Sequence, residues 1–136
     1  RLDPNTVIVQ LRFSPPKLLK PFIEDNDFIL LRTEKREEDG TILVLSRSVH
    51  HKGAPPIKGI KRGTCDIAGF IIRPHGRNAS EVIYLTQAVL KGVPKYLEVK
   101  WIIKRALILA SIKEFVNKES RNNNVPVWRS PEYNDS

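Results

Sequence analysis

Two neighbouring segments, FILLRTEK at residues 28–35 and TILVLSRSV at residues 41–49, indicate the architecture of this chain most directly. Both are rich in β-branched and large apolar residues and have the length of strands. The sequence between them, Glu37-Glu38-Asp39-Gly40, has the composition of a turn. The two segments are therefore predicted to form a β-hairpin.

Three further strands are predicted around this hairpin. One precedes it at residues 6–13 (TVIVQLRF), and two follow it at residues 60–73 (IKRGTCDIAGFIIR) and 81–88 (EVIYLTQA). Gly63 and Gly69 within the long segment indicate bulges or sharp curvature. Five strands joined by short connections are typical of an antiparallel meander.

A single helix is predicted after the strands, at residues 94–118. Pro94 suits its first turn, where the missing backbone N–H is not needed. Apolar residues recur at steps of three and four, which is the pattern of a helix with one wide apolar face that must be covered. These residues are Leu97, Trp101, Ile102, Ala106, Leu109, Ala110, Ile112 and Phe115.

The composition is that of one folded domain. The chain has 136 residues, of which 40% are hydrophobic and 28% charged. We expect the domain to span residues 1–120 and residues 121–136 to form a flexible tail. The sequence contains no methionine and starts at Arg1, so we expect an excised or processed piece. No segment has the roughly 20 apolar residues of a membrane span, and we expect a soluble intracellular protein.

The net charge of +8 favours an anionic partner, either a nucleic acid or an anionic membrane surface. A basic run in the predicted helix, Lys100, Lys104 and Arg105, supports the nucleic acid. The small number of aromatic residues available for stacking and the absence of a recognition motif oppose it. We therefore expect a membrane surface and no nucleic acid as the partner.

No catalytic or metal-binding constellation is visible in the sequence. The single cysteine, Cys65, can form no disulfide within the chain and has no second cysteine with which to build a zinc site; buried packing is its expected role. The histidines lie in predicted turns, and no serine or carboxylate pair has a context typical of catalysis. We expect a protein that is not an enzyme and has no metal and no cofactor.

A series of short motifs runs through the strands and into the predicted helix: Arg47-Ser48-Val49, Pro55-Pro56, Lys61-Arg62-Gly63, GFIIRP at residues 69–74, EVIYLTQ at residues 81–87 and LKGVPKY at residues 90–96. With this series, residues 5–118 resemble the START (steroidogenic acute regulatory protein-related lipid transfer) domain family. The resemblance implies an α+β helix-grip fold. In that fold a curved antiparallel β-sheet packs on a long C-terminal α-helix, and one lipid lies in the hydrophobic tunnel between them.

The resemblance covers the C-terminal two thirds of the family fold. The family domain has an N-terminal helix, further strands and two short helices before the point at which this chain begins, so the tunnel is expected to be open on one side. Exposed strand edges invite pairing between copies, and an oligomeric or domain-swapped form is a further expectation. A lipid-sensing accessory domain of a larger protein is an alternative.

The face of the sheet that lines the tunnel is predicted from the alternation of side chains along strands. Phe28 and Leu30 share a face with Arg32. From the sequence alone these positions would be interpreted as an ordinary core, but in this fold the core face and the ligand wall are largely the same surface. The other predicted lining residues are Leu43, Leu45, Ala68, Phe70, Ile72, Tyr84, Thr86, Ile102, Ile103, Ala106 and Ala110.

Arg32 stands where several family members place a basic residue inside the tunnel. A buried arginine needs a partner, because an unpaired buried charge is costly. Some relatives supply an acidic residue on the preceding strand, where this chain has Gln10, Arg12 and Phe13. The resemblance therefore implies a phosphate head group for Arg32, and the alternative is that Arg32 points to solvent. Phospholipid is the first expectation for the ligand and sterol the second, with ceramide or fatty acyl chains also open.

The segment at residues 15–27 contains three prolines and is predicted to be a loop with an apolar middle. It resembles the first Ω-loop of the family, and residues 50–59 form the expected companion loop. Apolar side chains insert between lipids while Lys17 and Lys20 contact anionic head groups, each giving about 1 kcal/mol. We expect a cytoplasmic protein, peripheral at membranes; the alternative is a loop folded onto the core. The predicted gate residues are Leu18, Leu19, Phe22 and Ile23.

Overall fold

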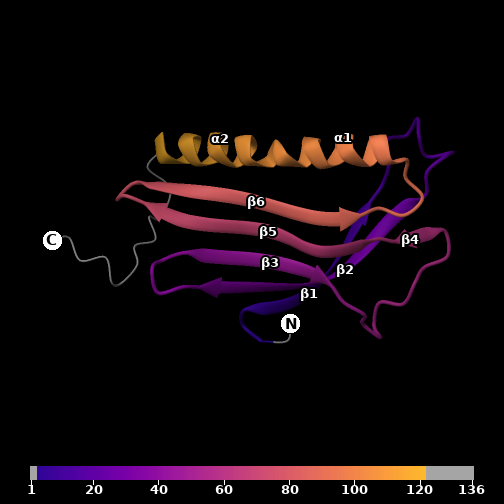
Figure 1. Cartoon of the computed structure of the whole chain (residues 1–136), viewed down its shortest axis with the longest axis horizontal. Helices are drawn as coiled ribbons and strands as arrows, with labels where there is room; N and C mark the ends of the chain where they lie inside the picture. The colour runs from indigo at the N-terminus through magenta and orange to yellow at the C-terminus, as the bar shows by residue number, and fades with distance from the viewer. Residues whose placement is uncertain (1–2, 122–136) are drawn as a thin grey trace.

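The computed structural model describes residues 3–121, which form six strands followed by two helices (Figure 1). The predicted tail beyond Arg121 lies outside the described residues. Neither helix in the described range has the length and apolar character that crossing a bilayer requires. The elements are β1 (Thr6–Phe13), β2 (Asp25–Arg36), β3 (Ile42–Ser48), β4 (Ile60–Arg62), β5 (Thr64–His75), β6 (Ala79–Val89), α1 (Lys95–Ala106) and α2 (Ile108–Arg121).

The strands form one sheet in the order β1-β2-β3-β5-β6, and each strand is antiparallel to its neighbour. This order confirms the predicted meander, and β1 has the predicted bounds. The short strand β4 lies off this path and pairs in parallel with the start of β2. The single strand predicted over residues 60–73 is therefore wrong, because the chain divides it into β4 and β5 at Gly63.

Steric requirements at two glycines explain this division and the shape of β5. A side chain at Gly63 would overlap the ring of Phe28, and the N–H of Gly63 donates to the carbonyl oxygen of Asp27. Gly69 has a φ of 151°, and a side chain there would overlap the carbonyl oxygen of Val44 on β3. Only glycine allows the backbone to pass so close to its neighbours at both positions.

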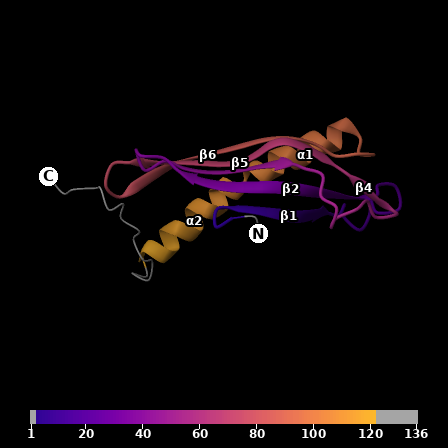
Figure 2. The same cartoon turned by 90° about the horizontal axis from the view of Figure 1, so that it is seen from below.

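The two helices together cover the predicted helix of residues 94–118. α1 begins directly after Pro94, as expected for a proline at a helix start. Leu107 separates the helices, and its N–H donates to the carbonyl oxygen of Lys104, three residues earlier, as in a tight 3₁₀ turn. Figure 2 shows that the helices cross one face of the sheet obliquely, with α2 extending away from the strands.

The main core cluster lies on the side of the sheet that faces α1, and Ile29 is buried on the other face of β2. Phe28 and Leu30 of β2 are buried together with Cys65 of β5, which confirms the packing role expected for the cysteine. Half-buried residues of the neighbouring strands and of the connection after β6 complete this cluster: Val9, Ala68, Ala88 and Leu90. The observed architecture is therefore the predicted helix-grip arrangement of a curved sheet on a C-terminal helix.

The register of the β2–β3 hairpin corrects two predicted lining residues. The loop at residues 37–41 has an odd number of residues, and Arg32 consequently pairs with Ser46. Because side chains alternate along a strand, Leu43 and Leu45 lie on the face opposite Arg32. The prediction that Leu43 and Leu45 share the face of Arg32 is therefore wrong. The two leucines would lie on that face only if the hairpin loop had an even number of residues.

Candidate functional site

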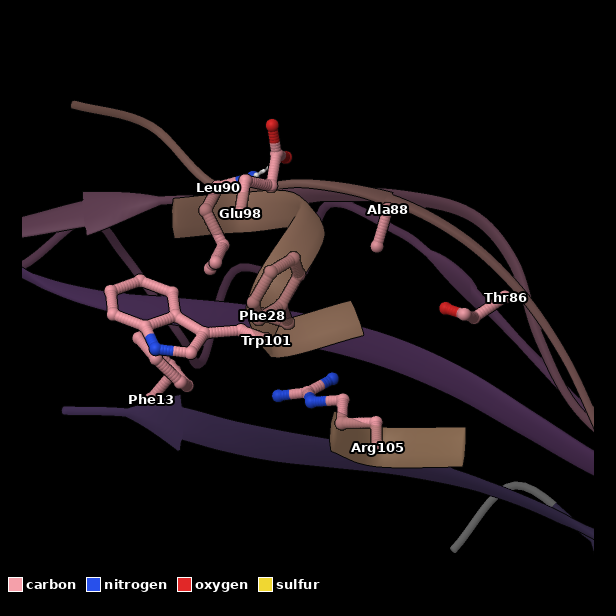
Figure 3. Close-up of a pocket in the computed structure, with 8 residues that line it drawn as sticks. All are labelled: Phe13, Phe28, Thr86, Ala88, Leu90, Glu98, Trp101 and Arg105. Carbon is pink, nitrogen blue, oxygen red and sulfur yellow. Dashed lines mark hydrogen bonds between the residues drawn. The ribbon is translucent and has the colours of Figure 1, made fainter. Parts of the chain in front are cut away.

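A small cavity lies between α1 and the sheet, near the start of β2 (Figure 3). It encloses about 20 Å³, which is room for about one water molecule. Its walls come from β1, β2, β6 and α1 and are mostly apolar. The lining residues are Phe13, Phe28, Thr86, Ala88, Leu90, Glu98, Trp101 and Arg105.

Trp101 and Arg105 close this cavity from the helix side. The ring centroids of Trp101 and Phe13 are 4.7 Å apart, a separation typical of a favourable aromatic pair. The guanidinium carbon of Arg105 lies 5.9 Å from the centroid of the Phe13 ring, which is within the range of a cation–π interaction. In Figure 3 this guanidinium is directed into the space beside Phe28 and Trp101.

Glu98 is the buried carboxylate of the lining. Its Oε1 accepts a hydrogen bond of 3.0 Å from the N–H of Leu90, and its Oε2 lies 3.5 Å from Nζ of Lys95. Its place in the first turn of α1 suits a negative charge, because the helix dipole is positive there. The side chain thereby ties the start of α1 to the end of β6.

Asn26 ties β2 to the same connection. It is fully buried, and its side chain makes two hydrogen bonds with the backbone of Lys91. The Oδ1 atom accepts from the Lys91 N–H at 2.7 Å, and Nδ2 donates to the Lys91 carbonyl oxygen at 3.1 Å. The side-chain amide of Asn26 thus supplies hydrogen-bond partners to the backbone N–H and carbonyl oxygen of Lys91, just after the end of β6.

Asp27 joins β2 to the loop before β4. Its side chain is 2% exposed and accepts hydrogen bonds from Nε and Nη2 of Arg62, at 2.7 and 3.0 Å, and from Nε2 of Gln10 at 3.1 Å. The Arg62 hydrogen bonds are the largest effect on the pKa of Asp27 and hold it below its ordinary value, against the opposing effect of burial. The same guanidinium donates to the carbonyl oxygens of Ala54 and Pro55, so Arg62 fastens the loop to a buried carboxylate.

Most of the predicted strand residues lie on the cavity side of the sheet. Phe28 and Thr86 line the cavity itself. Further along the same face, the rings of Phe70 and Tyr84 pair across β5 and β6 with their centroids 5.2 Å apart. The predicted residues that share this face are Phe28, Leu30, Ala68, Phe70, Ile72, Tyr84 and Thr86.

The helix contributes different residues from those predicted. Ile103 is 64% exposed and is not part of the cavity lining, which contradicts its predicted role. Ala106 and Ala110 are also exposed, and the side chain of Ile102 lies outside what the structure describes. Two of the α1 residues that line the cavity are charged. A search for apolar residues at helical spacing therefore predicts the wrong side of α1 as the lining. The α1 residues that line the cavity are Glu98, Trp101 and Arg105.

The two arginines on this side of the molecule have different surroundings. Arg32 shares the face of Phe28 but is exposed and lies outside the cavity lining, which matches the alternative that it points to solvent. Arg105 is exposed as well, but its side chain lines the cavity. Sequence analysis assigns Arg105 only to a basic helix face; its spacing of four residues from Trp101 is the signal that places it in the site.

The predicted gate separates into an exposed pair and an inward pair. Leu18 and Phe22 are 84% and 83% exposed, whereas Leu19 is half-buried and Ile23 is buried. The N–H groups of Phe22 and Ile23 donate to the carbonyl oxygen of Leu19, so one turn of chain holds the four residues. The alternative of a loop folded onto the core therefore describes Leu19 and Ile23 only. Figure 1 places this loop at the same end as the loop before β4 and the start of α1.

A curved sheet that packs its apolar face against a C-terminal helix defines the helix-grip class of proteins, and this chain is one of them. The sequence also matches the model of the START domain over residues 1–121. The chain therefore belongs to the START domain family, as its motifs indicated. No curated protein matches the sequence.

Three solved human structures are similar to the chain. Human StAR-related lipid transfer protein 5 has a TM-score of 0.69 and 22% sequence identity, over 84% of this chain and 57% of that chain. Human STARD10 has a TM-score of 0.61 and 23% identity, over 85% and 43%. The lipid transfer and protein localization domain of human StarD13 (DLC2) has a TM-score of 0.58 and 27% identity, over 69% and 46%. The chain thus spans about half the length of these structures.

Proposed function

We propose that this chain binds one lipid molecule between the sheet and the helices and transfers it between membranes. The observation that carries the proposal is the apolar face of the sheet opposite α1, which forms both the main core cluster and the cavity. Membership of the START domain family supports it. So do two of the similar human structures, which are named as a lipid transfer protein and a lipid transfer domain. The proposal assigns the chain no chemical step.

Binding a lipid requires the helices to move away from the sheet. The cavity of about 20 Å³ is far smaller than the roughly 300 Å³ or more that ligand pockets enclose. The contacts that would have to part come from α1, chiefly the ring pair of Trp101 and Phe13. On α2, Phe115 and Val116 are exposed. We infer that the lipid chains enter along the face that carries Phe70 and Tyr84.

The proposed ligand is a phospholipid, and a sterol is the alternative. On the cavity side of the molecule, neither Arg32 nor Arg105 has a carboxylate partner within residues 3–121. A guanidinium without a carboxylate partner is well suited to phosphate oxygens, which it binds through two parallel hydrogen bonds. A sterol offers a single hydroxyl group and needs no positive charge. The two arginines therefore favour the phospholipid.

The proposed membrane gate is the loop at residues 14–24. Its exposed Leu18 and Phe22 are suited to insertion among lipid chains, and Lys17 and Lys20 to contact with anionic head groups. The loop before β4 lies at the same end of the molecule and is its proposed companion. With such a gate, the proposed protein is cytoplasmic and in peripheral contact with an anionic membrane.

Self-association through a sheet edge is a further part of the proposal. β6 ends the strand order and carries one charged residue, Glu81. A long edge strand with little charge is a template for pairing with another strand. The partner strand comes from a second copy or, if the chain serves as an accessory domain, from elsewhere in a larger protein.

Native mass spectrometry of the purified chain, followed by lipid extraction, tests the proposed function. We expect one phospholipid per chain, and the same spectrum gives the oligomeric state. A chain that carries no lipid, and that takes up neither phospholipid nor sterol from vesicles, would contradict the proposed carrier function.

The gate is tested by the double substitution Leu18→Ser with Phe22→Ser. We expect binding to vesicles of phosphatidylcholine and phosphatidylserine, measured by flotation, to weaken by roughly tenfold or more, because two apolar side chains no longer enter the bilayer. The matched control is Phe115→Ser with Val116→Ser, since it removes two exposed apolar residues from α2. An equal loss in the control would assign membrane binding to general surface hydrophobicity instead of the gate.

A further inference from the structure

Among the described residues, Arg105 is the only positively charged side chain that lines the cavity. The lining has one carboxylate, Glu98, and both of its oxygens face other groups, the N–H of Leu90 and the ammonium of Lys95. Within residues 3–121 Arg105 makes no hydrogen bond or ion pair, and its recorded contact is with the face of the Phe13 ring. The exposed guanidinium, with its five donors, thus borders both the cavity and the solvent, and no acceptor from the described residues binds it.

Two other arginines at this end of the molecule have carboxylate partners. Arg62 binds Asp27 through two nitrogens, and Arg12 binds Asp25 in the same manner. Both arginines that link one segment of this chain to another therefore have a carboxylate partner. Arg105 has none, and unlike Arg32, which also has none, it lines the cavity and is therefore available to a ligand there.

The guanidinium of Arg105 lies close to the core. Burial raises the pKa of the Cys65 thiol and the charge of Asp66 raises it further, whereas the charge of Arg105 lowers it. Arg105 therefore influences a residue buried in the sheet, as expected for a side chain that reaches inward from α1. Figure 3 shows the hydroxyl group of Thr86 on the other side of the same space. Within residues 3–121 this hydroxyl makes no hydrogen bond.

We propose that Arg105, with the Thr86 hydroxyl across the cavity from it, binds the anionic oxygen group of the lipid, a phosphate or a carboxylate. The head group then lies near Trp101, and the acyl chains extend over Phe70 and Tyr84. This inference rests on the lipid-carrier function proposed above. It assigns head-group recognition to Arg105 and not to Arg32, because Arg32 lies outside the cavity lining.

The test compares Arg105→Gln with Lys104→Gln, which removes the same charge from the adjacent position of α1, one that is also exposed but does not line the cavity. The full chain is mixed with phosphatidylcholine vesicles that contain a self-quenched fluorescent phosphatidylcholine, and uptake is read from the fluorescence gain. We expect Arg105→Gln to weaken binding by roughly tenfold to a hundredfold, as expected when one charge-assisted hydrogen-bonded pair is lost. Lys104→Gln should change it by less than about twofold.

Two further measurements separate ligand recognition from folding. Arg105→Lys should recover part of the binding, because it restores the charge but not the planar pair of donors. The circular dichroism melting curve of Arg105→Gln without lipid should stay close to that of the unmodified chain, since Arg105 has no carboxylate partner in the protein. A melting temperature that falls together with uptake, with no recovery in Arg105→Lys, would overturn the proposal in favour of a structural role.

The remaining outcomes distinguish the inference from the function on which it rests. Equal uptake by the unmodified chain and Arg105→Gln overturns the inference, as does a loss confined to Arg32→Gln. If the unmodified chain takes up neither the labelled phosphatidylcholine nor a labelled fatty acid, the carrier function itself fails. Uptake of the fatty acid alone, with the same dependence on Arg105, supports the inference and identifies a carboxylate as the anionic group.

Discussion

The two ends of the sheet are held by different kinds of interaction. At the end where β2 begins, the buried side chains of Asn26, Asp27 and Glu98 link the strands to a loop and to α1. Breaking a buried ion pair costs about 3–5 kcal/mol, whereas an exposed pair contributes about 1 kcal/mol at most. We therefore expect the helices and sheet to part first at the hairpin end. Three ion pairs between described residues at that end are exposed: Lys35 with Glu37, Arg36 with Glu34, and Arg73 with Glu81.

The largest effect is expected from Asp27→Ala. This substitution leaves Arg62 and Gln10 without their acceptor, and we expect the free energy of unfolding in urea to fall by about 3 kcal/mol. Glu81→Ala is the control at the hairpin end, because it removes only the exposed pair with Arg73, and it should change that free energy by less than about 0.5 kcal/mol. Similar losses in the two variants would remove the distinction between the ends.

A smaller effect is expected from Glu98→Ala. The substitution leaves the partly buried N–H of Leu90 without an acceptor, and we expect a loss of about 2 kcal/mol in the free energy of unfolding. Hydrogen exchange localises the change, because the Leu90 amide should exchange faster. Glu114→Ala on the exposed surface of α2 should leave both quantities unchanged. If protection of the Leu90 amide persists in Glu98→Ala, this carboxylate does not hold α1 to β6.

The smallest effect is expected in mild acid. The pKa of Asp27 lies below its ordinary value of 3.8, first because of the hydrogen bonds from Arg62. A carboxyl group whose pKa is lower in the folded than in the unfolded chain stabilises the fold above the unfolded pKa. That contribution is lost as the pH falls through the folded pKa. Urea unfolding should therefore show declining stability below about pH 4, where Asp27 is still mostly ionised in the folded chain.

The variant Asp27→Asn tests whether Asp27 causes the decline in stability at low pH. The substitution removes the titrating group at the loop end, so the decline in stability with acid should become shallower. Equal declines in the two proteins would assign the acid sensitivity to Asp25 and Asp39, whose pKa values are also lowered by hydrogen bonds, chiefly from Arg12 and from Thr41 respectively.

The sequence predicts most of the sheet because apolar alternation and turn residues are local signals. β1 has the bounds predicted for it, and the meander order is the one expected. The assignment of Leu43 and Leu45 to a face fails because it depends on the number of residues in the hairpin loop. Composition predicts that a turn exists there, but not whether its length is odd or even.

The start of β2 is missed for a different reason. Three polar residues in succession, Asp25, Asn26 and Asp27, have the composition of a loop, and the sequence analysis places them in one. In the structure they belong to β2, and two of them are buried. Burial is tolerated because Arg62 and the backbone of Lys91 satisfy them, and partners so distant in the chain leave no local pattern.

In the candidate site the sequence identifies the sheet wall but not the helix wall. Phe28, Phe70 and Tyr84 follow from strand alternation and lie on the cavity side. Arg105 is missed because periodicity analysis looks for apolar residues, whereas a ligand site is marked by a polar residue within an apolar stripe. The spacing between Trp101 and Arg105 is informative only once the side of α1 that faces the sheet is known.

The hydrogen bonds between Asn26 and Lys91 also have a kinetic consequence. The two residues are 65 positions apart in the chain, so their contact requires a long loop to close, whereas the β2–β3 hairpin closes locally. We expect this contact to form late in folding. A contact formed after the rate-limiting barrier slows unfolding and leaves the folding rate nearly unchanged. Asn26 then sets how long the folded chain persists rather than how fast it is reached, a difference that unfolding and refolding rates report separately.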